Sequence, residues 1–71
     1  MTFWYKTKRG TFYIAPRAGR WHIIYDDDSL GSYASPQQAA EELAGGYSAW
    51  PHFDPSTLGI PDDISEWNVS R

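Results

Sequence analysis

Two histidines and two groups of aspartates are the residues of this chain whose types suit acid–base or metal chemistry. The histidines are His22 and His52, and the aspartates stand together at positions 26–28 and 62–63. Neither histidine has a nucleophilic residue beside it at a spacing that indicates a catalytic pair. His22 in a strand-like run is typical of a half-exposed structural residue, and His52 is typical of a loop residue.

The aspartates also have an explanation without chemistry. A hard-cation loop needs further oxygen ligands at fixed offsets and a turn-making glycine, and a solvated hairpin turn is the better interpretation of residues 26–28. Asp62 and Asp63 follow a proline and suit the positive end of a short helical turn. The absence of cysteine excludes thiolate zinc sites and thiol nucleophiles. We therefore expect no metal, no cofactor and no catalytic residues, and a function in binding.

Basic side chains are concentrated at the start of the chain, although the net charge is −3. Five of them lie in the first twenty residues, where there is no acid: Lys6, Lys8, Arg9, Arg17 and Arg20. One interpretation is an ordinary solvated surface of mixed charge. The other is a basic face that contacts phosphates, with Trp21 or Tyr13 contacting the bases.

Runs of β-forming residues predict the elements that would position these side chains. Strands are predicted at 11–15, 20–25 and 30–34, with a further strand at 3–7. Turns are predicted between them at 8–10, 16–19 and 26–29. Period-two alternation places three sets of residues on common faces: Phe12 with Ile14; Trp21 and Ile23 with Tyr25; and Leu30 and Ser32 with Ala34.

A single helix is predicted to cover an apolar face of this sheet. Ser35 is a favoured N-cap, Pro36 suits the first helical position, and Gln38 completes a capping box. Gly45-Gly46 ends the helix in the left-handed conformation. Its apolar stripe consists of Ala39, Ala40, Leu43, Ala44 and Tyr47.

The last third of the chain has a different composition. Residues 48–71 are rich in proline and in large apolar side chains, namely Trp50, Phe53, Leu58, Ile60, Ile64 and Trp67. These are too many to leave in water, so we expect this extension to fold back and cover part of the sheet face opposite the helix. A short helical piece is predicted to begin at 54–57 and end at Gly59, and another single turn at 60–67.

The predicted fold is therefore α+β. It is a three-stranded antiparallel meander, or a four-stranded one with residues 3–7, packed against one helix, with an irregular aromatic and proline-rich C-terminal extension. Seventy-one residues make a single domain, 1–71, with its core in 10–47 and the extension in 48–71.

Residues 10–46 resemble two DNA-binding families. The resemblance rests on Trp21 in the middle strand, the run from Leu30 to Pro36, and the alanines of the helix. This arrangement is similar to the DNA-binding domain of plant ethylene-response transcription factors and to the arm-binding domain of tyrosine integrases. In those domains Arg and Trp side chains on the sheet enter the major groove. Most of the chain also resembles small uncharacterised bacterial proteins that have the same strand-to-helix step and a Trp/Pro-rich C-terminal tail.

These observations favour a soluble, cytoplasmic module that binds another protein. No segment reaches the ~20 apolar residues of a membrane span, and the start is not a signal peptide. Surplus aromatics suit an interface, and the strand at 30–34 has an edge that a partner strand, or a second copy, could join. The alternative is nucleic-acid binding through Lys6, Lys8, Arg9, Arg17, Arg20 and Trp21. An isoelectric point near 5.0 and the aspartate turn weigh against it.

Overall fold

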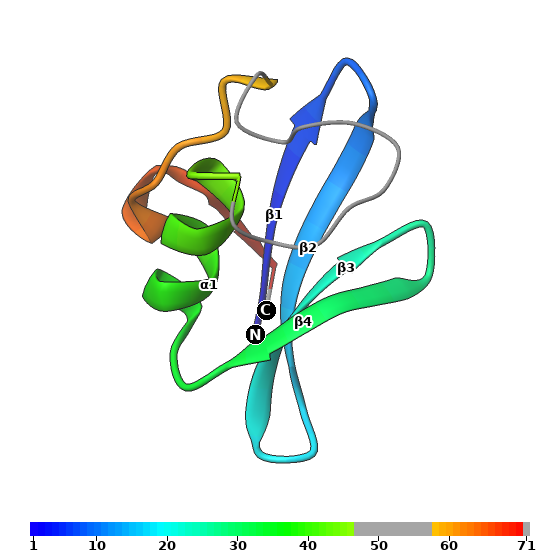
Figure 1. Cartoon of the computed structure of the whole chain (residues 1–71), viewed down its shortest axis with the longest axis vertical. Helices are drawn as coiled ribbons and strands as arrows, with labels where there is room; N and C mark the ends of the chain where they lie inside the picture. The colour runs from blue at the N-terminus through cyan, green and yellow to red at the C-terminus, as the bar shows by residue number, and fades with distance from the viewer. Residues whose placement is uncertain (47–57, 71) are drawn as a thin grey trace.

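The structure, a computed structural model of the chain, describes residues 1–46 and 58–70 (Figure 1). Its strands are β1 (Thr2–Thr7), β2 (Gly10–Arg17), β3 (Arg20–Tyr25), β4 (Asp28–Tyr33) and β5 (Asn68–Ser70). Its helices are α1 (Pro36–Ala44) and the 3₁₀ turn η2 (Ile64–Glu66). The expected contributions of Tyr47, Trp50 and Phe53, and the helix start at 54–57, lie outside the described residues.

The strands form one antiparallel sheet in the order β4-β3-β2-β1-β5. The α+β class is confirmed, and the optional strand at 3–7 is real as β1. The predicted number of strands, three or four, is too low. Residues 68–70 form a further strand that pairs with β1, with Phe3 opposite Val69. The end of the C-terminal extension is therefore an edge strand and not irregular chain. A three-residue strand carries too little pattern to be recognised from sequence.

Two of the turns, predicted at 16–19 and 26–29, are shorter in the structure. Ala18 and Gly19 have φ of 54° and 79°, and Asp26 and Asp27 have φ of 53° and 66°. Positive φ at both central residues is the two-residue hairpin turn whose twist matches the flanking strands. The residues predicted to be in these turns on either side, such as Arg17 and Asp28, belong to strands instead.

A bulge in β4 overturns the predicted faces of that strand. Ile23 pairs with Gly31 and Ile24 pairs with Ser29, which leaves Leu30 as the extra residue. Leu30 and Tyr33 both pack against the core, whereas Ser32 lies opposite His22 on the other face. Simple alternation placed Leu30 and Ser32 together, because one inserted residue reverses the pattern beyond it.

The helix begins and ends where the sequence predicts. The Ser35 hydroxyl accepts from the Gln38 backbone N–H at 3.1 Å. The Gln38 side chain accepts from the Ala34 N–H at 3.3 Å, one residue before the position of a capping box. At the other end, Gly45 is right-handed and Gly46, with φ 80°, is the left-handed residue. Its N–H donates to the Leu43 carbonyl at 3.1 Å.

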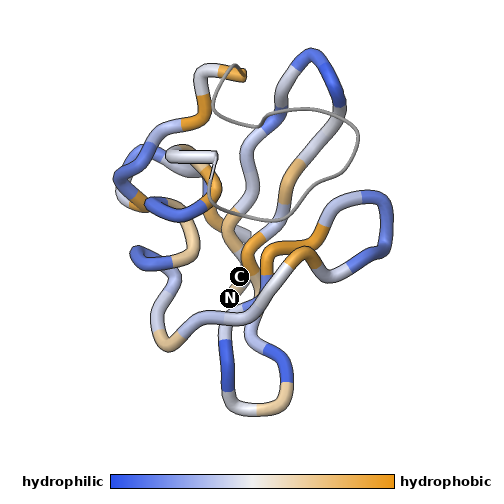
Figure 2. Tube along the Cα trace, in the orientation of Figure 1, coloured by the Kyte–Doolittle hydropathy of each residue, from blue (hydrophilic) through white to orange (hydrophobic). Residues whose placement is uncertain are grey.

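The core lies between the sheet and α1. Its members are Phe12, Ile14, Ile23, Ala39, Ala40, Leu43, Ile60 and Trp67. Figure 2 shows hydrophobic residues along the central strands and hydrophilic ones at the hairpin tips. Ile60 and Trp67 come from the C-terminal extension, and the Trp67 indole donates to the Pro61 carbonyl at 3.0 Å.

Residues 58–70 pack on the helix side of the sheet and along its β1 edge, beside α1 (Figure 1). Gln37 of α1 holds η2, because its side-chain oxygen accepts from the Ile64 N–H at 2.9 Å. The expected cover over the opposite face is wrong for this part of the chain. Within residues 1–46 and 58–70, no helix is long and apolar enough to cross a membrane.

Leu43→Ala is expected to destabilise the protein by about 2–5 kcal/mol, because Leu43 is fully buried where α1 meets the sheet. Urea unfolding followed by tryptophan fluorescence measures this loss. The control, Glu42→Ala on the same helix, should change stability by less than about 0.5 kcal/mol. Equal effects of the two substitutions would show that α1 does not cover the sheet in this way.

Asp63 should titrate below the 3.8 of an ordinary aspartate, because the Ser65 N–H and hydroxyl donate to its carboxylate at 3.0 Å and 2.9 Å and lower its pKa. A lowered pKa means that the carboxylate stabilises the fold above its unfolded pKa, and that this contribution disappears as the pH falls through the folded pKa. NMR titration of the Asp63 carboxyl carbon measures it, and Ser65→Ala should move the pKa back up. A pKa at or above 3.8 would contradict this contact.

Candidate nucleic-acid interface

The sheet face that points away from α1 is left uncovered by the described residues. We call it the open face and define it from the strand register as the side chains opposite the core: Thr2, Trp4, Lys6, Thr11, Tyr13, Ala15, Arg17, Arg20, His22, Ile24, Ser29, Ser32, Asn68 and Ser70. It exists because successive strand residues point to opposite faces, so the sequence neighbours of a buried strand residue point to the other face.

An apolar row crosses the middle of the open face. Trp4, Tyr13 and Ile24 are direct register partners on β1, β2 and β3. Tyr13 is 43% exposed, and Trp4 and Ile24 are half-buried. Phe12, the sequence neighbour of Tyr13, is fully buried. The row therefore presents two aromatic side chains side by side on a surface that the core does not use.

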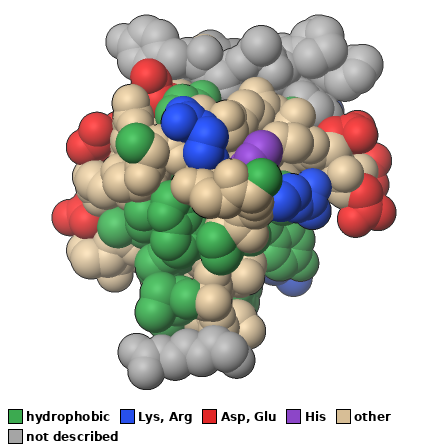
Figure 3. Space-filling view, turned by 90° about the horizontal axis from the view of Figure 1, so that it is seen from below, with side chains coloured by type: hydrophobic (Ala, Val, Ile, Leu, Met, Phe, Trp, Pro, Cys, Tyr) green, Lys and Arg blue, Asp and Glu red, His purple; other side chains and the backbone are tan. Residues whose placement is uncertain are grey.

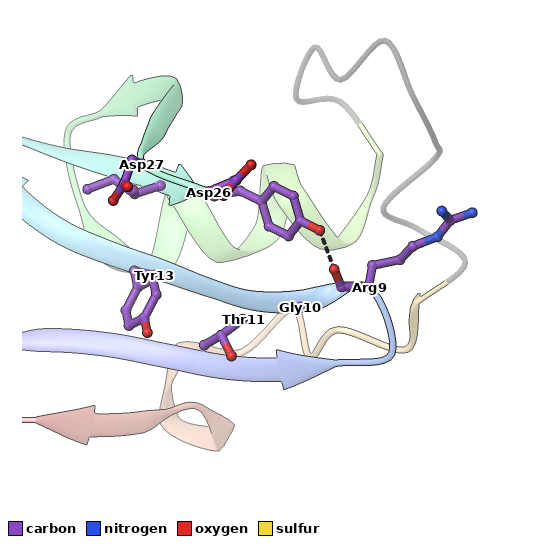
Figure 4. A pocket seen from close by; sticks show the side chains of 8 residues that line it. Arg9, Gly10, Thr11, Tyr13, Asp26 and Asp27 are labelled. Atoms are coloured by element: carbon purple, nitrogen blue, oxygen red, sulfur yellow. Dashed lines mark hydrogen bonds between the residues drawn. The ribbon is translucent and has the colours of Figure 1, made fainter.

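Two shallow hollows lie on either side of Tyr13. The first hollow, of about 460 Å³, is lined by Thr2, Trp4, Thr11, Tyr13 and Ser70. The second hollow, of about 470 Å³, is lined by Arg9, Gly10, Thr11, Tyr13, Ile24, Tyr25, Asp26 and Asp27 (Figure 4). Thr11 and Tyr13 line both hollows, so the Tyr13 side chain stands between two adjoining depressions.

Three of the five predicted basic residues belong to the open face. Lys6 lies beside Thr11 at one end of the face, and Arg17 and Arg20 pair at the other end, six residues along β2. At about 3.3 Å per residue these ends are about 20 Å apart. Arg20 is held in place, because its guanidinium donates to the Ser32 hydroxyl at 3.1 Å and the Ser32 carbonyl at 3.2 Å.

The other two basic residues, Lys8 and Arg9, form the turn between β1 and β2. They therefore lie at the Lys6 end of the sheet. Basic side chains therefore lie at both ends of the apolar row, three at the Lys6 end and two at the Arg17 end.

Apart from Asp26 and Asp27, which line the second hollow, the described acids lie away from the open face. Among the open-face positions that the structure describes, none carries a carboxylate. Asp26 and Asp27 sit in the turn after β3, and the remaining described acids are Asp28, Glu41, Glu42, Asp62, Asp63 and Glu66 on β4, α1 and the C-terminal segment. Figure 3 shows a histidine side chain with basic side chains on both sides and acidic side chains toward the margins of the view. The net charge therefore hides two surfaces of opposite character.

Trp21 is not on this surface, contrary to its predicted contact with bases. It pairs with Tyr33 on the helix side and packs against the core, with its ring 5.9 Å from that of Phe3. The described tryptophan on the open face is instead Trp4, the register partner of Tyr13. No pattern identified Trp4 in advance, because Phe3, Trp4 and Tyr5 are all aromatic and show no polar–apolar alternation that would assign their faces.

The structure also brings together a histidine and a serine that the sequence did not connect. His22 Nδ1 lies 2.8 Å from the Ser29 hydroxyl across β3 and β4. A catalytic pair of this kind needs a third group to orient the imidazole and donors for a developing oxyanion. Among the described open-face positions there is no carboxylate that could orient the imidazole. Among residues 1–46 and 58–70, no group of three or more His, Asp or Glu side chains is placed to hold a metal.

Comparisons of the chain with protein-family models, curated proteins and solved structures found no significant match.

Tyr13→Thr should leave the fold intact, because Tyr13 is exposed and threonine is also a good strand residue. We expect a loss below about 1 kcal/mol in urea unfolding. Phe12→Ala, one residue earlier in the buried row, should cost about 3–5 kcal/mol. Comparable losses at both positions would mean that Tyr13 is structural and that the open face is covered.

Proposed function

We propose that the protein binds single-stranded nucleic acid on the open face. The observation that supports this most directly is the combination on the open face of two aromatic side chains, the half-buried Trp4 and the exposed Tyr13, with basic side chains at both ends. Surfaces that bind single strands use these two components, a positive path for the backbone and aromatic side chains on which bases stack.

A single strand suits this surface better than a duplex. Stacking on Trp4 or Tyr13 requires the flat side of a base, which is occupied by neighbouring bases in a double helix. Five strands at a spacing of about 4.8 Å make a sheet about 19 Å wide, whereas the major groove is about 12 Å wide. The three-stranded sheet predicted from the sequence, about 10 Å wide, would have fitted the groove. The additional strands β1 and β5 remove that fit.

The net charge of −3 does not prevent this binding. Interactions between exposed charges are screened beyond about 8 Å at physiological ionic strength. The acids of α1 and the C-terminal segment lie on the other side of the sheet, so the open-face cations dominate the field that a bound strand meets. The Asp26–Asp27 turn borders one end of the face and restricts where phosphates can lie.

We expect the binding of a labelled single-stranded nonamer to weaken with salt. If Lys6, Arg17 and Arg20 each neutralise one phosphate, the slope of log K against log salt is about −2, from about −0.7 per contact. Arg17→Gln should reduce that slope by about 0.7. Tyr13→Thr should lower affinity about 5- to 150-fold, the equivalent of one stacked base, without changing the slope. Fluorescence anisotropy at several salt concentrations measures both.

The matched control is Val69→Thr, which also removes an exposed apolar side chain, here 45% exposed, but on the helix side of the sheet. It should leave affinity unchanged. Binding that is equally sensitive to Val69→Thr and Tyr13→Thr would contradict the assignment of the surface. Tighter binding to a duplex of the same sequence would contradict single-strand recognition and favour groove binding of the kind that the ethylene-response resemblance implies.

A protein partner is the second candidate, and the position of β4 at the edge of the described sheet favours it. Within the described residues β4 neighbours only β3 in the sheet, so a partner strand has an outer edge to join. If the nucleic acids above do not bind, this edge becomes the better candidate. Amide exchange would then be expected to slow in β4, and not on the open face, when a partner is added.

A further inference from the structure

The second hollow has the components needed to hold one complete nucleotide. Arg9 lies at one end, in the turn between β1 and β2, and Asp26 and Asp27 lie at the other, in the turn between β3 and β4. Figure 4 shows the Arg9 guanidinium extending away from the two aspartates. Thr11 and Tyr13 lie on β2, the strand that follows the Arg9 turn. A cation, an aromatic ring and hydrogen-bond acceptors therefore line the same hollow.

The two ends of the hollow are connected to each other. The Tyr25 hydroxyl donates to the Arg9 backbone carbonyl, which links the two turns (Figure 4). Gly10, with φ 132°, lets the chain pass close to that ring, because a Cβ there would lie 3.2 Å from Tyr25. Asp26 and Asp27 form a two-residue turn with positive φ, so their backbone is also restrained.

A carboxylate beside a stacked base selects the base by its hydrogen bonds. It can only accept, so it favours a base edge that presents donors. Guanine presents two adjacent donors, the N1–H and the 2-amino group, which match the two oxygens of one carboxylate. Thymine and uracil present a single N–H between two carbonyl oxygens, which the carboxylate repels. Cytosine and adenine present one amino group beside an acceptor nitrogen.

We propose that the second hollow is a guanine-selective subsite of the single-strand surface. In this arrangement the base lies against Tyr13, and its donor edge meets the carboxylates of the Asp26–Asp27 turn. The inference rests on the proposed function and adds a preferred base to it. It also gives a role to the aspartate turn, which by charge alone would oppose nucleic-acid binding.

Three nonamers test the inference: all thymine, thymine with one central guanine, and thymine with one central inosine. Inosine keeps the ring and the N1–H of guanine and lacks only the 2-amino group. We expect the guanine strand to bind about 5- to 150-fold more tightly than the all-thymine strand, the discrimination of one bidentate contact. Inosine should lose most of that gain. A single guanine per strand avoids four-stranded assemblies.

The variants Asp26→Asn and Asp27→Asn separate recognition from simple charge. Asparagine tolerates positive φ, so the turn is retained. Removing a carboxylate that only repels phosphate would raise the affinity for all three strands by the same factor. Removing the carboxylate that recognises guanine should lower the affinity for the guanine strand and raise that for the all-thymine strand. We therefore expect at least one of the two variants to lower the affinity for the guanine strand and to raise the affinity for the all-thymine strand.

The failures of this inference and of the proposed function can be distinguished. Salt-sensitive binding of all three strands with equal affinity would overturn guanine selectivity and leave single-strand binding standing. A guanine preference that survives both aspartate substitutions would overturn the assignment to the second hollow. No binding of any strand would overturn the proposed function, and the inference with it.

Discussion

One-sided burial of the sheet is the constraint on which the rest of the structure depends. Phe12 and Ile14 on β2 and Ile23 on β3 are fully buried under α1, with Ile60 and Trp67 completing the same layer. A strand that buries every second residue must direct the others to the opposite face. Among the described residues α1 is the only α-helix, and the C-terminal segment adds to its side. The composition of the open face is therefore a consequence of which face was buried.

Local signals in the sequence predicted the part of the fold that neighbouring residues determine. The helix from Pro36 to Ala44 follows from its Ser35 cap, its alanines and its terminal glycines, all within a dozen residues. The hairpins follow from β-forming runs and turn residues. The β4 bulge at Leu30, in contrast, depends on how β4 fits β3, and β5 exists only because Asn68–Ser70 return to β1 from across the chain. Long-range pairing of this kind leaves no periodic signal.

The candidate site was predicted only in part for the same reason. The positions of Lys6, Arg17 and Arg20 at the two ends of one face could be anticipated from strand and turn placement. That Trp4 and not Trp21 lies on the open face could not be anticipated, because it depends on which face of the sheet α1 covers. Overall charge was a poor guide, since Glu41 and Glu42 on the helix and Arg17 on the sheet contribute to one sum while facing different directions. Charge distribution over the faces, and not the total, bears on the partner.

The measurement that tests the central claim most directly is a map of amide and indole chemical shifts during titration with a single-stranded oligonucleotide. A binding surface on the open face predicts that the largest changes lie at Trp4, Tyr13 and His22, with small changes at Leu43 and Ile60 beneath the sheet. Changes concentrated on α1, or along the outer edge of β4, would contradict the account and place recognition elsewhere on the molecule.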